Sequence, residues 1–242
     1  MPSTSHLAHL QQMSSGSTVE DEYPPHAQSG PVSLLFDYTL DFGREHTIVI
    51  SRLREPSEIP RPADYVELLP VAYYLSVDPR FRLVLLSPTY DTVAAISFVS
   101  FQKPVVEVQE QTDISARSLH SGSNMSSDRV KLSCRWKGAK TRFSGDRSIS
   151  FTWERQGKDE IFDLWVTEAL KIESPSFIER KQTRRVGTMK RSTIAETDSK
   201  RVVIEANTRY IGEVAMLASA LTILKKDALE ERQKKAMADL GY

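Results

Sequence analysis

Histidine is the side chain best suited to acid–base chemistry near neutral pH, and the 242-residue chain contains five. His6, His9 and His26 lie in a polar N-terminal stretch, His120 lies in a Ser-rich stretch, and His46 alone lies among strand-like residues. A general base or a metal site needs an imidazole fixed by a partner group, and two histidines on a tail fall short of a zinc site. The histidines therefore predict no catalytic residue, no metal site and no cofactor.

The single cysteine, Cys134, alternates with Leu132 and Trp136, a pattern that predicts an inward-facing, inert thiol. One cysteine excludes an intrachain disulfide and fits a reducing compartment. The N-terminus also lacks the apolar segment of a signal peptide. We therefore expect a cytoplasmic or nuclear location, including the peripheral surface of a membrane.

Paired carboxylates occur at Asp159–Glu160 and at Glu230–Glu231, where the surrounding residues indicate a turn and a charged helix. Both positions are typical of solvated surface. The chain has neither a phosphate-cradling glycine loop nor a nucleophile-elbow motif. These observations favour a protein that is not an enzyme, with a carboxylate-based hydrolase as an alternative.

Positive charge is the chemistry that the sequence presents most clearly. The whole chain is balanced, with 32 Lys and Arg against 32 Asp and Glu, but residues 1–128 carry 8 basic and 16 acidic side chains and residues 129–242 carry 24 and 16. Six basic residues without an intervening acid lie close together: Arg180, Lys181, Arg184, Arg185, Lys190 and Arg191. A second basic set precedes them: Lys131, Arg135, Lys137, Lys140, Arg142 and Arg147.

If strands bring the two basic sets to one face, that face would bind an anionic headgroup through charge-assisted hydrogen bonds. The alternative is an ordinary basic strand surface balanced by the acidic first half. Aromatic residues beside basic ones also occur in nucleic-acid-binding proteins. Here Trp136, Phe151, Trp153 and Trp165 lie in alternating segments, which we interpret as core, so no nucleic-acid partner is expected.

Alternation of apolar and polar residues indicates that most of the chain is β-strand, beginning at Leu34–Phe42. Five more strands are expected in the first half, at 47–51, 73–77, 81–86, 94–101 and 105–108. The second half predicts strands at 130–136, 149–153, 161–166, 177–180, 185–189, 192–196 and 201–205. The segment Arg155–Lys158 contains a glycine and predicts a hairpin turn between two of them.

The last segment differs in kind, because Val214–Leu224 has eleven uncharged residues rich in Ala and Leu. This predicts a helix that is apolar around its whole circumference and enclosed by protein, and it is too short to span a bilayer. The same helix is expected to continue from Lys225 to Ala238 as a charged, solvated extension. We therefore predict a disordered tail at 1–30, one domain at 31–228 with a polar loop at about 109–128, and a charged helical extension at 229–242.

Many strands followed by one buried helix is an uncommon order. The segment from Val130 to Lys226 resembles the tubby C-terminal-like superfamily, which includes LURP-one-related proteins and phospholipid scramblases. The likeness lies in Trp136-Lys137-Gly138, Phe143-Ser144-Gly145, Phe151-Thr152-Trp153, Val186-Gly187 and Val214–Leu224. It implies a mostly β fold, an antiparallel β-barrel enclosing a C-terminal hydrophobic α-helix.

The resemblance also implies a class of ligand, because tubby binds phosphoinositides. The leading hypothesis is thus a binding or adaptor module for anionic membrane lipid, with protein partners also expected. A scramblase-type membrane protein is the alternative within the superfamily. The chain departs from the scramblases because it lacks their longer final segment and their cysteine-rich regions.

Overall fold

The computed structural model describes residues 30–39, 46–53, 69–78, 82–98, 104–109, 129–145, 150–157, 160–170, 180–194 and 199–240. Within them the first six strands are β1 (Pro31–Thr39), β2 (His46–Arg52), β3 (Val71–Asp78), β4 (Arg82–Leu86), β5 (Thr92–Phe98) and β6 (Pro104–Gln109). The next six are β7 (Arg129–Lys137), β8 (Lys140–Ser144), β9 (Ser150–Arg155), β10 (Ile161–Leu170), β11 (Arg180–Thr193) and β12 (Ser199–Asn207). A 3-10 turn, η3 (Thr208–Tyr210), leads into the helix α1 (Glu213–Asp239).

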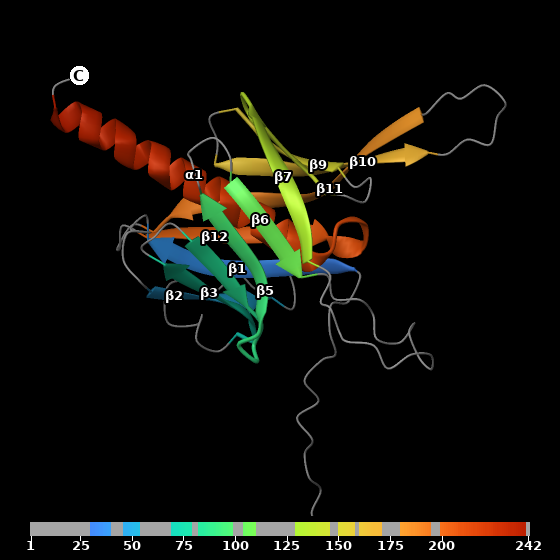
Figure 1. Cartoon of the computed structure of the whole chain (residues 1–242), viewed down its shortest axis with the longest axis horizontal. Helices are drawn as coiled ribbons and strands as arrows, with labels where there is room; N and C mark the ends of the chain where they lie inside the picture. Colours follow the sequence, from blue (N-terminus) through green and yellow to red (C-terminus); the bar gives the residue numbers. More distant parts are fainter. Residues whose placement is uncertain are drawn as a thin grey trace, which may run out of the picture.

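These twelve described strands form one closed antiparallel barrel in which each strand pairs with its sequence neighbours, and β1 pairs with β12 to close it (Figure 1). Such an order needs only hairpin connections, which suits a chain of alternating segments separated by turn residues. The predicted mostly β fold, an antiparallel barrel around a C-terminal helix, is confirmed.

The barrel interior is filled by the apolar side of each strand. Leu34, Phe36 and Tyr38 of β1 are 0–2% exposed, and the inward aromatic residues Phe151 and Trp153 of β9 are 0–1% exposed. Because successive side chains of a strand point to opposite faces, the residues between them point outward. Inner and outer surfaces are therefore built from interleaved residues of the same strands.

The first half of α1 lies in the barrel interior, with residues on every side of it buried, and the second half projects from the barrel (Figure 1). Met216, Leu217 and Ala220 are 0% exposed. The indole nitrogen of Trp153 donates to the hydroxyl oxygen of Ser219 at 2.8 Å, which ties β9 to the helix. Among the described residues, no helix has the length and hydropathy needed to cross a membrane.

The buried part of α1 is longer than expected. We predicted that solvated helix would begin at Lys225, but Lys225 is 0% exposed and Leu229 is 7% exposed. That prediction is wrong because ion-paired side chains at the barrel mouth enclose the helix for a further turn. The helix is exposed from Gln233 onward.

Three other expectations are corrected. The segments 185–189 and 192–196 are not two strands, because β11 runs unbroken through Lys190 and Arg191. β8 was not predicted as a strand, since Lys140–Ser144 shows only two inward positions. Trp165 is not core, because Leu164 and Val166 occupy the inner positions of β10 and leave it on the outer face.

All but one end residue of each of three predicted segments falls outside the described residues: the tail at 1–30, the loop at about 109–128 and the strand at 177–180. Arg147 and every histidine except His46 lie there too. The predicted hairpin is confirmed, because β9 and β10 are antiparallel neighbours. Gly157 in their turn has φ +56°, a value that favours glycine.

Candidate anion-binding site

The outer face of β7 to β11 is the surface on which the basic residues of the second half meet. The strand register places one residue from each strand in a continuous cross-strand row: Arg135, Arg142, Thr152, Trp165 and Arg185. Directly opposed side chains on one face lie within contact distance of each other. Members of both basic sets, Arg135 and Arg142 of one and Arg185 of the other, therefore share one face.

Arg135 and Arg142 are directly opposite each other on β7 and β8, and both are exposed. Like charges in this position destabilise a sheet. In the part of the chain that the structure describes, no carboxylate forms an ion pair with either. By contrast, an ion pair with a carboxylate is formed by each of Arg52, Arg155, Arg185, Arg191 and Arg201.

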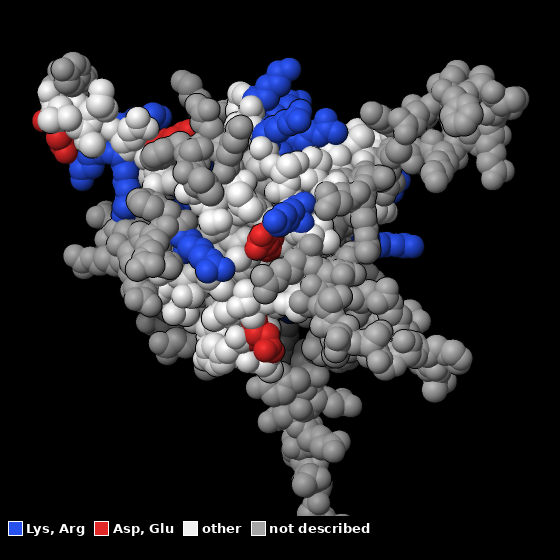
Figure 2. Space-filling model, in the orientation of Figure 1, with Lys and Arg blue, Asp and Glu red and all other residues white. Residues whose placement is uncertain are grey.

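A hollow of about 230 Å³ lies between the two arginines and is lined by Arg135, Arg142 and Ser144. In Figure 2, Lys and Arg side chains gather over the upper end of β7, where this hairpin lies. Two guanidinium groups around a small hollow are suited to bind the oxygens of a phosphate group.

A row of hydroxyl groups borders the arginines. Ser133 and Ser144 are paired across β7 and β8, with their hydroxyl oxygens 2.7 Å apart. On the next strand, Ser150 accepts a hydrogen bond of 2.7 Å from the Nε of Arg142. That bond orients the guanidinium group, and the serine hydroxyls provide further donors for an anion.

The residues predicted as a binding segment have different surroundings. Arg180 and Lys181 begin β11, but their side chains lie outside the described residues. Arg184 donates to the hydroxyl of Tyr210 at 2.9 Å, and its guanidinium carbon lies 4.9 Å from the centre of that ring. Arg185 is on the outer face, 2.7 Å from Asp163, and Lys190 is exposed farther along the strand.

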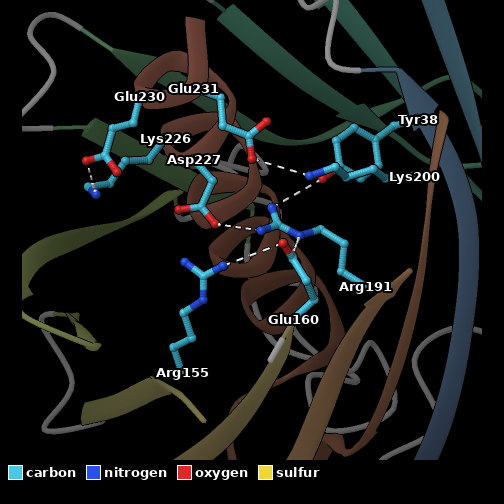
Figure 3. Close-up of polar contacts among 9 residues, drawn as sticks. All are labelled: Tyr38, Arg155, Glu160, Arg191, Lys200, Lys226, Asp227, Glu230 and Glu231. Atoms are coloured by element: carbon cyan, nitrogen blue, oxygen red, sulfur yellow. Dashed lines mark hydrogen bonds and ion pairs between the residues drawn. The ribbon is translucent and has the colours of Figure 1, made fainter. Parts of the chain in front are cut away.

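Arg191 is the exception, because it points into the barrel mouth and its side chain is 1% exposed. It pairs with Glu160, with Asp227 of α1 at 3.1 Å, and with the hydroxyl of Tyr38 at 3.4 Å (Figure 3). A residue held in this way has no free donors to offer a surface ligand. The site proposed below therefore does not include Arg191.

The environment of this mouth cluster changes the acidity of its members. Burial raises the pKa of Tyr38 to about 12, so its hydroxyl stays protonated. Burial also raises the pKa of Asp227, although Arg191 opposes the shift. Arg155 lies 3.6 Å from Glu160, and Lys200 lies 3.3 Å from Glu231 (Figure 3). The cluster joins five strands or strand ends to the helix at the point where it leaves the barrel.

A carboxylate-based hydrolase would require two convergent acids. Glu160 and Asp227 are candidates, since both converge on Arg191. The guanidinium group between them compensates their charge, which is the arrangement of a structural ion-pair network. Within the residues described, no group of three or more His, Cys, Asp and Glu is placed to hold a metal ion. Burial raises the pKa of Cys134 to about 12, which makes its thiol a poor nucleophile near neutral pH.

Sequence reasoning considered that the set containing Arg135 and Arg142 could share a face with the later basic set, but it named only the later set as the binding segment, and it missed the serine row. A signal was present: Ser133, Arg135 and Lys137 alternate with the apolar Leu132 and Cys134 and so had to face outward. The opposition of β7 to β8 was not visible, because β8 was not recognised.

Comparison of the chain with protein-family models, with curated proteins and with solved structures finds no match in any of the three. The arguments that follow therefore depend on the barrel and its outer face.

Proposed function

We propose that this protein is a non-enzymatic binding module of tubby-like fold that recognises phosphorylated headgroups of anionic membrane lipids. The observation that carries the proposal is the direct opposition of Arg135 and Arg142 without an acidic partner among the described residues. A bound phosphate would relieve their repulsion, and the neighbouring serine hydroxyls would complete its hydrogen bonds.

A membrane surface suits this face better than a single small anion. Arg185 lies three strands from Arg142, which corresponds to about 14 Å, so the row presents two separate positive centres. Trp165 lies between them on the outer face, and tryptophan is favoured where a protein surface meets the lipid–water boundary. The single cysteine fits action at a cytoplasmic or nuclear membrane surface.

A scramblase-type mechanism would require α1 to enter the lipid. Leu217 and Leu221 are 0–1% exposed within the barrel, so insertion would expose the core that the strands share with the helix. This cost favours a role in binding, with the helix kept inside the barrel.

Liposome co-sedimentation tests the proposal. The full chain should bind vesicles that contain a phosphoinositide more strongly than neutral vesicles, and the double variant Arg135→Glu/Arg142→Glu should lose most of that difference. The control is Arg82→Glu/Arg209→Glu, which makes the same charge change at exposed sites on β4 and η3. Arg191 is left unchanged, because replacing it would disturb the barrel mouth.

Equal binding to both kinds of vesicle would refute the proposal. The same loss in the control variant would show that net charge alone, and not the arginine pair, accounts for the binding. Binding to free inositol phosphate as tight as to vesicles would identify a soluble anion as the ligand instead of a membrane.

A further inference from the structure

The second half of α1 projects from the barrel and carries two exposed apolar side chains at its end (Figure 1). Met237 is 45% exposed and Leu240 is 72% exposed. Together with the exposed Gln233 they follow the spacing i, i+4, i+7, which places three residues on one side of a helix. We call these three uncharged residues the end face of α1.

The direction of the end face is fixed where α1 leaves the barrel. The ammonium nitrogen of Lys226 lies 4.8 Å from the centre of the indole ring of Trp136 on β7. Gln233 and Leu240 follow Lys226 by seven and fourteen residues, which is close to two and four full turns. They therefore point to the same side of the helix as Lys226, which is the side of the barrel formed by β7.

That side also carries the arginine pair. Successive residues of a strand point to opposite faces, so Arg135 points outward where its neighbour Trp136 points toward the helix. The end face and Arg135 therefore point in the same general direction. In Figure 1 the end of α1 and the upper end of β7 lie along the same upper margin of the molecule, and Figure 2 shows Lys and Arg side chains gathered over that end of β7. A flat surface in contact with the arginine pair can thus also reach the end of α1.

The charges around the end face suit an anionic membrane. Lys234 is exposed and lies beside the end face, where its long side chain can reach phosphate oxygens while apolar neighbours enter the lipid. Glu230, on the same side but nearer the barrel, is paired with Lys226. Asp239 points away from the end face. A coiled-coil partner would need apolar positions sustained over about three heptads or more, and the end face spans one.

We propose that the end face of α1 is a second membrane contact, at which Met237 and Leu240 enter the headgroup boundary of the lipid layer to which the arginine pair binds. This inference rests on the proposed function. The buried half of α1 stays in the barrel, so only side chains that are already exposed change their environment. Two apolar side chains strengthen an electrostatic contact without anchoring the protein by themselves.

Co-sedimentation of the full chain with vesicles that contain a phosphoinositide tests this contact. Met237→Ser/Leu240→Ser should lower the affinity for these vesicles about tenfold and leave the binding of free inositol phosphate unchanged. The matched control, Val49→Ser/Val105→Ser, removes two exposed apolar side chains from β2 and β6 and should bind like the wild type. In a second measurement, Leu240→Trp should add tryptophan fluorescence that brominated acyl chains quench, and the tryptophan added by Val105→Trp should not be quenched.

Unchanged vesicle binding by Met237→Ser/Leu240→Ser, or equal quenching of the two added tryptophans, would overturn the second contact and leave the arginine pair in place. Loss of binding in that variant but not in Arg135→Glu/Arg142→Glu would support the end face and overturn the proposed function. Self-association of the wild type without lipid, lost in Met237→Ser/Leu240→Ser, would assign the end face to a second copy instead. A wild type that binds no vesicles would overturn both proposals.

Discussion

Arginine side chains on the outer and on the inner surface of the barrel have opposite surroundings. Arg135 and Arg142 lie directly opposite each other on the outer face, and no carboxylate among the described residues forms an ion pair with either. Arg191 lies on the inner side of β11. Its side chain is 1% exposed and contacts two carboxylates and a tyrosine hydroxyl. A buried charge must be compensated by the fold, whereas an exposed pair of like charges can be left for a ligand. Arg191 is therefore a structural residue, and we propose the uncompensated Arg135–Arg142 pair as the place where a ligand binds.

The largest expected effect comes from removing the inner arginine. Arg191→Met should lower the free energy of unfolding by about 3–5 kcal/mol, because Glu160 and Asp227 would lose the cation between them. Urea unfolding followed by tryptophan fluorescence measures this change. The matched control is Arg135→Met on the outer face, which should change the free energy by less than about 0.5 kcal/mol. Equal effects of the two substitutions would remove the proposed distinction.

The pH dependence of stability tests the environment of Asp227, which contacts the inner arginine Arg191. Burial raises the folded-state pKa of Asp227 above its unfolded value, so the folded protein holds this proton more tightly. The wild type should therefore gain free energy of unfolding relative to Asp227→Asn as pH falls through the raised pKa toward about 4. At pH 7 the two should differ by less than about 1 kcal/mol, because the cost of burying the charged Asp227 offsets its attraction to Arg191.

Urea titrations of both proteins between pH 4 and pH 7 measure that difference. Taking the difference cancels the titration of other acids that is common to the two proteins. If the wild type instead loses free energy of unfolding relative to Asp227→Asn as the pH falls, Arg191 outweighs burial and lowers the pKa of Asp227.

The smallest effect is expected on the outer face. Arg142→Met should raise the free energy of unfolding by a few tenths of a kcal/mol at low ionic strength, because it relieves the repulsion from Arg135. The gain should vanish in 1 M salt, which screens exposed charges. Urea unfolding at the two salt concentrations checks this. A loss above about 1 kcal/mol would show that the hydrogen bond from Arg142 to Ser150 has a structural role.

Much of the fold could be predicted from local patterns. Alternation located most strands, and the uncharged run Val214–Leu224 identified the buried helix. Local patterns failed where polar residues lie inside. Lys190 and Arg191 looked like a break in β11, and Lys225 looked like the beginning of solvated helix, because a sequence does not reveal which charges will find buried partners.

The candidate site was less predictable than the fold. The sequence alone determined that the second half is basic and that its strands have one polar face. Only the tertiary structure decided that Arg135 opposes Arg142, that Arg185 shares their row and that Arg191 does not. The physical reason is that alternation fixes the side of a strand on which a residue lies, while pairing and register between strands depend on contacts among residues distant in the chain.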